Sequence, residues 1–173
     1  MAKQDIFRSK EVLAEEARKR ASDYESQYHG CGQSALLALQ EVLGLEDEQV
    51  FKSASGLCGG MAFEGKFCGA LTTGLMILGM KFGRANIQDG LPGILKGIMP
   101  AHKLMRRFDQ EFGTTVCREI LGGAMGQTSE EQFRAMIANP EALEEMSRKV
   151  LAKCSQVVGK TAAMVVEIIS EES

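Results

Sequence analysis

Five cysteines are the most reactive side chains in this sequence of 173 residues. A cysteine thiolate can bind zinc, iron or an iron–sulfur cluster, and it can also form a disulfide. The stretch GLCGGMAFEGKFCGALTTGLMILG, residues 56–79, holds two of these cysteines. Its many glycines indicate a backbone that turns sharply or approaches another group closely. The candidate metal ligands are Cys31, Cys58, Cys68, Cys117 and Cys154.

The cysteines fall into two kinds of local setting. Cys31, Cys68 and Cys117 each follow a loop and precede an apolar run with helical spacing. The free N–H groups and the dipole at a helix N-terminus favour a thiolate, so we expect reactive thiols there. Cys58 lies in the glycine-rich loop between the predicted helices 47–55 and 68–82, which we call the glycine loop. Cys154 lies on the apolar face of the last predicted helix.

Three glycines in or beside this loop are candidate cofactor-binding positions. Gly59 and Gly60 follow Cys58 directly, and Gly69 follows Cys68. Without a Cβ atom, they would allow backbone N–H groups to come close to the sulfur atoms of a cofactor. No residue of the sequence is assigned a catalytic role.

The spacing of the cysteines leaves several functions open. There is no C-x-x-C motif, so a zinc ribbon, a ferredoxin run and a thioredoxin-like dithiol are not supported. A site built from these cysteines would therefore be assembled by tertiary packing. Our first interpretation is an iron–sulfur or other metal site that serves electron transfer or redox sensing. The alternatives are a zinc-binding structural module, a thiol–disulfide switch with Cys58 and Cys68 as the pair, and plain packing, since cysteine is often buried.

The two histidines and one basic cluster are further candidates. His29 lies two residues before Cys31. Its three interpretations are a metal ligand, a base that lowers the pKa of the thiol, and an exposed residue of a turn. His102 stands in HKLMRR, residues 102–107, which a solvated helix face explains. Docking of an acidic partner or of a phosphate is the alternative interpretation of this cluster.

Apolar residues recur at helical spacing along almost the whole chain, which predicts an all-α fold. We expect a single-domain bundle of about six to eight helices over residues 1–173. It divides into an N-terminal helix within 1–27, a cysteine-bearing region over 28–154 and a C-terminal helix over 140–170. The predicted helices span 9–27, 33–43, 47–55, 68–82, 100–112, a short helix within TTVCREILGG (residues 114–123), 129–138 and 140–169. Residues 84–99 are predicted as a loop with short helical turns, because they contain three glycines and a proline.

Composition excludes two classes of protein. The net charge is −3 with both signs mixed, so nucleic-acid binding is not expected. The N-terminus has no signal-peptide core, and the longest apolar stretch is too short to span a bilayer. These features predict a cytoplasmic protein without membrane insertion, whose cysteines are thiols or ligands. Apolar helices and ten methionines are compatible with a homodimer, while no redox partner is identifiable.

Four segments together resemble one known family. HGCGQSALLALQEVLGL, SGLCGGMAFEGKFCGALTTGLMILGMKFG, FGTTVCREILG and a late cysteine are similar to the C_GCAxxG_C_C family, whose members are regarded as redox-active. The likeness runs from about Tyr28 to Cys154. The four family cysteines fall on positions 31, 68, 117 and 154, and Cys58 is an additional one.

The resemblance implies redox activity with a metal or an iron–sulfur cluster, and no defined substrate. The chain also resembles the cysteine-bearing part of split-Soret cytochromes, where such cysteines are associated with an iron–sulfur site. Their haem-binding part has no counterpart here. One position departs from the family motif, because Thr73 stands where the motif has glycine, with Gly74 next. A threonine there is expected to limit how closely another helix approaches.

Overall fold

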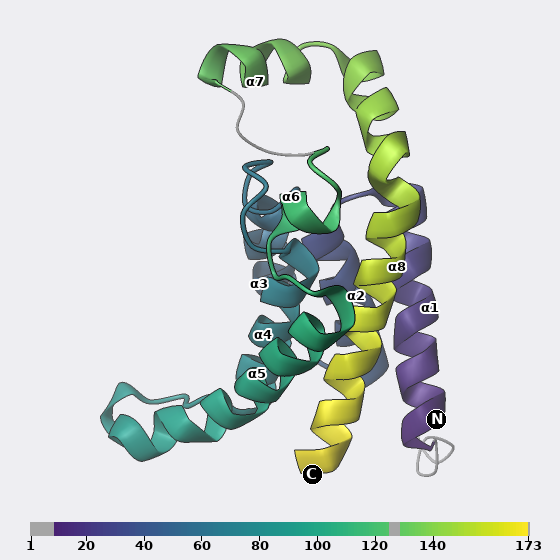
Figure 1. Ribbon diagram of the computed structural model, residues 1–173. Coiled ribbons are helices and arrows are strands. Elements are labelled where there is room, and N and C mark those ends of the chain that lie inside the picture. The colour runs from purple at the N-terminus through teal and green to yellow at the C-terminus, as the bar shows by residue number, and fades with distance from the viewer. Residues whose placement is uncertain (1–8, 125–128, 173) are drawn as a thin grey trace.

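The computed structural model describes residues 9–124 and 129–172, and within them the all-α prediction is confirmed. This part has eight α-helices, and the longer ones pack against one another as a bundle (Figure 1). The first eight residues of the expected N-terminal segment lie outside the described residues. The helices are α1 (Lys10–Tyr28), α2 (Cys31–Leu43), α3 (Glu48–Ser53), α4 (Gly69–Phe82), α5 (Gly90–Phe112), α6 (Cys117–Ile120), α7 (Glu130–Ile137) and α8 (Pro140–Glu172).

Helix ends follow the capping signals of the sequence. The Ser9 hydroxyl accepts a hydrogen bond from the N–H of Val12, and Gly44 ends α2 with a left-handed backbone. Ser129 and Gln132 form a reciprocal capping box at the start of α7. Two short 3₁₀ turns, Ala54–Leu57 and Ile87–Asp89, connect the larger helices.

Helices α1 and α8 lie antiparallel along one side of the bundle (Figure 1). They approach closely because small residues line the contact. A Cβ atom at Gly159 of α8 would lie 2.7 Å from the backbone oxygen of Arg18. On α1 the buried residues facing inward include Ala14, Ala17 and Ala21. Packed against this pair, α2, α4 and the second half of α5 contribute the large buried side chains, among them Leu36, Leu71, Ile77, Leu104 and Phe108.

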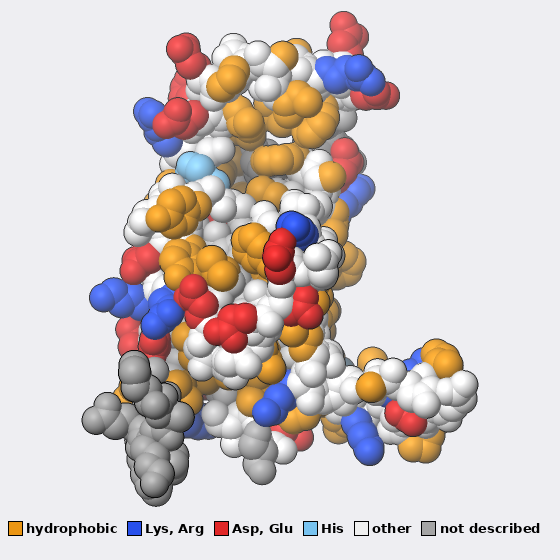
Figure 2. Space-filling model, turned by 180° about the vertical axis from the view of Figure 1, so that it is seen from behind, with side chains coloured by type: hydrophobic (Ala, Val, Ile, Leu, Met, Phe, Trp, Pro, Cys, Tyr) orange, Lys and Arg blue, Asp and Glu red, His pale blue; other side chains and the backbone are white. Residues whose placement is uncertain are grey.

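Residues 90–99 are helical, so the prediction of a loop over 84–99 is wrong for most of that stretch. Pro100 lies inside α5 and does not begin it. The glycines serve close packing here: a Cβ at Gly97 would lie 3.3 Å from Cα of Gly83. Since proline lacks an N–H, the helix bends along its length and its first half extends away from the bundle (Figures 1 and 2). This half leaves Leu91, Leu95 and other apolar residues exposed.

Among the described residues, no helix combines the length and the apolar character that crossing a bilayer requires.

Candidate functional site

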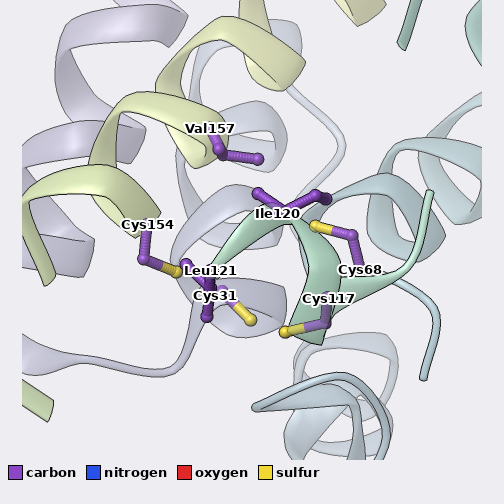
Figure 3. A pocket seen from close by; sticks show the side chains of 7 residues that line it. All are labelled: Cys31, Cys68, Cys117, Ile120, Leu121, Cys154 and Val157. Atoms are coloured by element: carbon purple, nitrogen blue, oxygen red, sulfur yellow. The ribbon is translucent and has the colours of Figure 1, made fainter. Parts of the chain in front are cut away.

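Four cysteines from four separate segments line one small buried cavity (Figure 3). Cys31 is the first residue of α2, Cys68 caps α4, Cys117 begins α6, and Cys154 lies in the middle of α8. The other lining residues are apolar, namely Ile120, Leu121 and Val157. The cavity has a volume of about 10 Å³, which is room for about one water molecule. The structure therefore places the four family cysteines together.

A short backbone pairing brings the Cys68 and Cys117 segments together. Phe67 and Val116 form an isolated antiparallel β-bridge. The N–H of Cys68 donates to the carbonyl of Thr115 at 2.9 Å, and the N–H of Cys117 donates to the carbonyl of Lys66 at 2.6 Å. Each cysteine follows a bridge residue directly and starts a helix, so the pairing fixes both sulfurs at the same edge of the cavity.

The glycine loop contains a run of left-handed backbone. Five consecutive residues, 59–63, have positive φ angles, and Met61, Ala62 and Phe63 among them are not glycine. Left-handed backbone costs an L-residue about 1–2 kcal/mol. The turn is held by backbone hydrogen bonds such as Ala62 N–H to Gly56 O at 2.8 Å and Gly65 N–H to Gly59 O at 3.0 Å. Backbone strain of this kind clusters at functional sites.

The three candidate glycines lie against the cysteine segments. A Cβ atom at Gly60 would lie 2.5 Å from Cβ of Cys117, and one at Gly69 would lie 2.8 Å from Sγ of Cys31. The N–H of Gly59 donates toward the Cys31 sulfur. The close approach expected at these positions is present, and their role toward a cofactor stays a prediction.

Cys58 borders a second, larger cavity that adjoins the first. This cavity has a volume of about 70 Å³ and shares Cys31, Cys117 and Cys154 with the smaller one. Cys58 is half-buried in its wall, and Cys31, rather than Cys68, is the sulfur within hydrogen-bond reach of Cys58. The Cys58–Cys68 pair expected for a thiol switch is therefore not the pair that this arrangement favours.

Cys31 is the thiol that is best stabilised as a thiolate. Its pKa lies well below the usual value, because the thiols of Cys154 and Cys58 donate toward its sulfur. The N–H groups of Gly59 and Gly32 add to this effect and outweigh burial. The same coupling raises the pKa values of Cys58 and Cys154. Cys31 is therefore the first of these three thiols to ionise, and the other two remain protonated beside it.

The other two helix-start cysteines behave differently. Burial, together with the smaller effect of the nearby Cys31 thiolate, raises the pKa of Cys68 to about 12 and that of Cys117 to about 12. The expectation of a favoured thiolate at every helix start is wrong for these two. At Cys68 the N–H groups of Leu71 and Ala70 do favour the thiolate, but desolvation is the larger effect.

Glu25 is a residue of the site that the sequence analysis missed. It lines the larger cavity, its exposed fraction is only 5%, and its Oε2 atom is buried without a hydrogen-bond partner. Burial raises the pKa of its carboxyl to about 7, and the Cys31 thiolate acts in the same direction. The register of α1 contained the signal, since position 25 continues the buried alanine face of positions 14, 17 and 21.

The raised pKa of Glu25 predicts how the stability of the metal-free protein depends on pH. The folded state binds the proton more tightly than the unfolded state, whose pKa is near 4.5. Stability is therefore expected to fall as pH rises from about 4.5 through 7, by at most about 3 kcal/mol. Denaturant unfolding of wild type and Glu25→Gln at pH 4.5 and pH 8 checks this. We expect Glu25→Gln to be more stable than wild type at pH 8. If the two proteins differed in unfolding free energy by the same amount at both pH values, the raised pKa of Glu25 would be contradicted.

His29 and Thr73 have defined places near the site. His29 is exposed and contributes to the wall of the larger cavity, beside Cys31. Thr73 is fully buried, and its hydroxyl donates to the carbonyl of Gly32 at 2.9 Å. Thr73 therefore ties α4 to the first turn of α2 without separating them, contrary to the expected steric limit.

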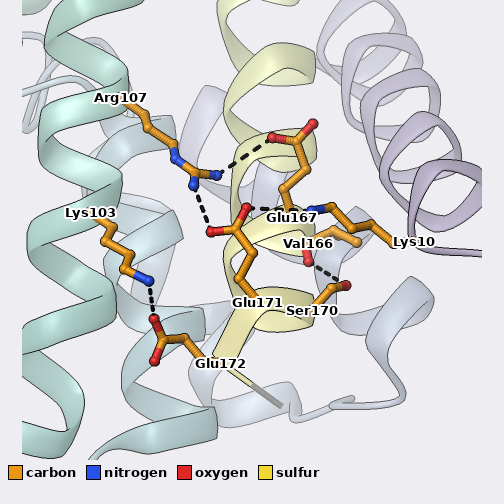
Figure 4. Close-up of polar contacts among 8 residues, drawn as sticks. All are labelled: Lys10, Lys103, Arg107, Val166, Glu167, Ser170, Glu171 and Glu172. Atoms are coloured by element: carbon orange, nitrogen blue, oxygen red, sulfur yellow. Dashed lines mark hydrogen bonds and ion pairs between the residues drawn. The ribbon is translucent and has the colours of Figure 1, made fainter.

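Two basic residues of α5, Lys103 and Arg107, pair with acidic residues of the same chain. Arg107 pairs with Glu171 at 2.6 Å and with Glu167 at 3.7 Å, and Lys103 pairs with Glu172 (Figure 4). Lys10 of α1 also reaches Glu171, at 3.4 Å. This network joins α1, α5 and the C-terminal end of α8, so acidic residues of the same protein already pair with Lys103 and Arg107 of the basic cluster.

The kinds of side chain at this site fit a metal, although their present orientation does not form a coordination sphere. As the side chains are oriented, no group of three or more His, Cys, Asp or Glu residues within 9–124 and 129–172 has the geometry to hold a metal ion. Four sulfurs nonetheless face one apolar cavity, and a fifth lies beside it. Buried thiols and an orphaned carboxylate oxygen are the chemistry that binds a soft or borderline cation.

Fold and site together define an all-α protein with a buried multi-cysteine cluster. The model of the family described as "Putative redox-active protein (C_GCAxxG_C_C)" matches residues 29–168. The chain belongs to this family, and the match extends beyond the 28–154 region expected from the sequence. No curated protein and no solved structure matches the chain.

Proposed function

We propose that this protein binds an iron–sulfur cluster through Cys31, Cys68, Cys117 and Cys154, for electron transfer or redox sensing. The observation that carries the proposal is the convergence of four cysteines, from four segments far apart in the sequence, on one apolar cavity. Packing alone does not require cysteine at four such positions. The match to a redox-active family supports the same function.

Each part of the site has a role in this proposal. The cluster, when bound, would supply a one-electron redox couple. The four thiols would hold it, and the Cys31 thiolate is already favoured by the N–H groups of Gly32 and Gly59. Ile120, Leu121 and Val157 give the cavity an apolar wall, which influences the reduction potential of a bound cluster. Cys58 donates toward the Cys31 sulfur from outside the four-sulfur cavity.

Anaerobic reconstitution with ferrous iron and sulfide tests this function. We expect stoichiometric iron and sulfide in the desalted protein, together with broad visible absorption from thiolate-to-iron charge transfer. Redox titration would then give a reversible midpoint potential. A colourless protein with one tightly bound zinc ion would indicate the structural zinc module instead, and a protein that retains no metal would overturn both.

A thiol–disulfide switch is the second candidate, and the sulfur contacts of Cys31 favour it. Its thiolate lies within hydrogen-bond reach of the Cys58 and Cys154 thiols. The thiolate would attack a disulfide such as oxidised glutathione and release one glutathione thiolate. Cys58 or Cys154 would then attack the mixed disulfide and release the second glutathione, leaving an intramolecular disulfide.

Peptide mapping after incubation with oxidised glutathione tests the switch. We expect Cys31 to be linked to Cys58 or Cys154 in metal-free protein. Retention of all five free thiols, or a Cys58–Cys68 disulfide, would exclude this mechanism.

A further inference from the structure

Glu25 places a carboxylate in the wall of a cavity whose other lining residues are mostly cysteines, glycines and apolar residues, with His29 and Ser147 as the remaining polar ones. Its side chain comes from α1, and the same cavity wall contains Cys31 of α2 and Cys154 of α8. The Cys154 thiol and the Ser34 hydroxyl interact with the carboxyl. Its second oxygen, Oε2, is buried and has no hydrogen-bond partner. Neither the family cysteines nor the four-thiol site assigns a role to this residue.

A buried carboxylate oxygen without a partner is unfavourable, because it has lost its hydration and gained nothing in return. Proteins compensate such an oxygen with a donor or a cation. The residues that face it from α1, α2, the glycine loop, α6 and α8 include no Lys or Arg. His29, at the same cavity, is exposed.

We propose that the Glu25 carboxylate is an oxygen ligand of the cation that the thiols of Cys31 and Cys154 bind. This deepens the proposed function and rests on it, because it changes the donor set from sulfur alone to sulfur and oxygen. Iron and zinc accept such mixed sets, since carboxylate oxygen is a common ligand of both beside thiolate or imidazole. The cavity of about 70 Å³ beside Glu25 is the space in which the two kinds of donor meet.

The arrangement explains why one helix carries an acid where its neighbours on the same face are alanines. Glu25 continues the buried stripe of Ala14, Ala17 and Ala21. An alanine at this position would pack against α8 without an electrostatic cost. The carboxylate destabilises the metal-free protein, and a bound cation converts that cost into an attraction.

The test compares wild type, Glu25→Gln and Glu16→Gln under anaerobic conditions. Glu16 is the matched control, because it lies on the same helix, is mostly buried, and pairs with Arg20 at 2.6 Å. Each protein is titrated with Co²⁺ in competition with a chelator, and is also reconstituted with ferrous iron and sulfide and challenged with the chelator. Thermal unfolding is recorded with and without Co²⁺.

We expect Glu25→Gln to bind Co²⁺ at least about tenfold more weakly and to lose iron faster than wild type. Without metal, its Tm should equal or exceed that of wild type, whereas the increase in Tm on adding Co²⁺ should be smaller. A variant that is at least as stable as wild type without metal but gains less stability on binding Co²⁺ has lost a metal ligand, not a structural residue. Glu16→Gln should show the same increase in Tm with Co²⁺ as wild type.

The outcomes separate the two proposals. Wild type that binds metal while Glu25→Gln matches it in affinity, iron retention and Tm increase would overturn the Glu25 assignment and leave the thiol site intact. Wild type that binds neither Co²⁺ nor iron would overturn the metal-binding function and the Glu25 assignment together.

Discussion

Replacing Cys31 by serine is expected to reduce the iron retained after reconstitution to less than about a tenth of the wild-type value. Cys31 is the sulfur toward which Cys58, Cys154, Gly59 and Gly32 all donate, so it is the centre of the negative charge in the site. Serine keeps the size of the side chain but binds iron and zinc weakly at neutral pH. Iron and sulfide analysis of desalted protein measures the effect, and far-UV circular dichroism confirms that the bundle is folded.

Cys58→Ser is the matched comparison for Cys31→Ser. Cys58 contacts Cys31 but does not line the four-sulfur cavity. We expect this variant to retain most of its iron, with a shift in reduction potential because one hydrogen bond to the Cys31 sulfur changes. Equal loss of iron in both variants would show that the cluster does not depend on the four-sulfur cavity in the way proposed.

Gly60→Ala is expected to destabilise the protein by about 3 kcal/mol, through steric overlap and left-handed backbone together. A Cβ atom at this position would lie 2.5 Å from Cβ of Cys117 and 2.8 Å from the backbone nitrogen of Lys66. The φ angle of Gly60 is 71°, which alanine adopts only at a cost. Denaturant unfolding of the metal-free variant measures the loss.

Gly56→Ala provides the control for Gly60→Ala within the same loop. A Cβ atom at Gly56 would meet nothing within 4 Å, and Gly56 does not have a positive φ angle. We expect its stability to stay within about 0.5 kcal/mol of wild type. Similar losses in the two variants would mean that glycine content, rather than the contact with Cys117, determines the stability of the loop.

The sequence predicted the helices well where their signals are local. Apolar periodicity and caps such as Ser9, Gly44 and Ser129 depend on neighbours within a few residues, so the sequence alone specifies them. The exception is α5, where glycines and Pro100 are typical of a loop. There the close packing of Gly93 and Gly97 against the preceding segment, which is a tertiary contact, outweighs the local preference.

Which residues form the site could be predicted in part from the sequence, whereas the pKa values of their side chains could not. The family resemblance indicated the four cysteines, but which sulfurs meet depends on how four helices pack. Burial, which a linear pattern does not report, raises the pKa of Cys68 and Cys117 in spite of their helix-start positions. Glu25 was missed because an acid on a helix of alternating charges is usually on the surface.

The left-handed run over residues 59–63 has a consequence for chirality. Its non-glycine members, Met61, Ala62 and Phe63, adopt φ angles of 65°, 49° and 65°, which are the natural conformation of mirror-image amino acids. A protein assembled by chemical ligation with D-alanine at position 62 would relax the backbone in place, whereas the same replacement in any helix of the bundle would break it. In this short segment, L-amino acids disfavour the left-handed backbone conformation that the loop adopts beside the cysteines.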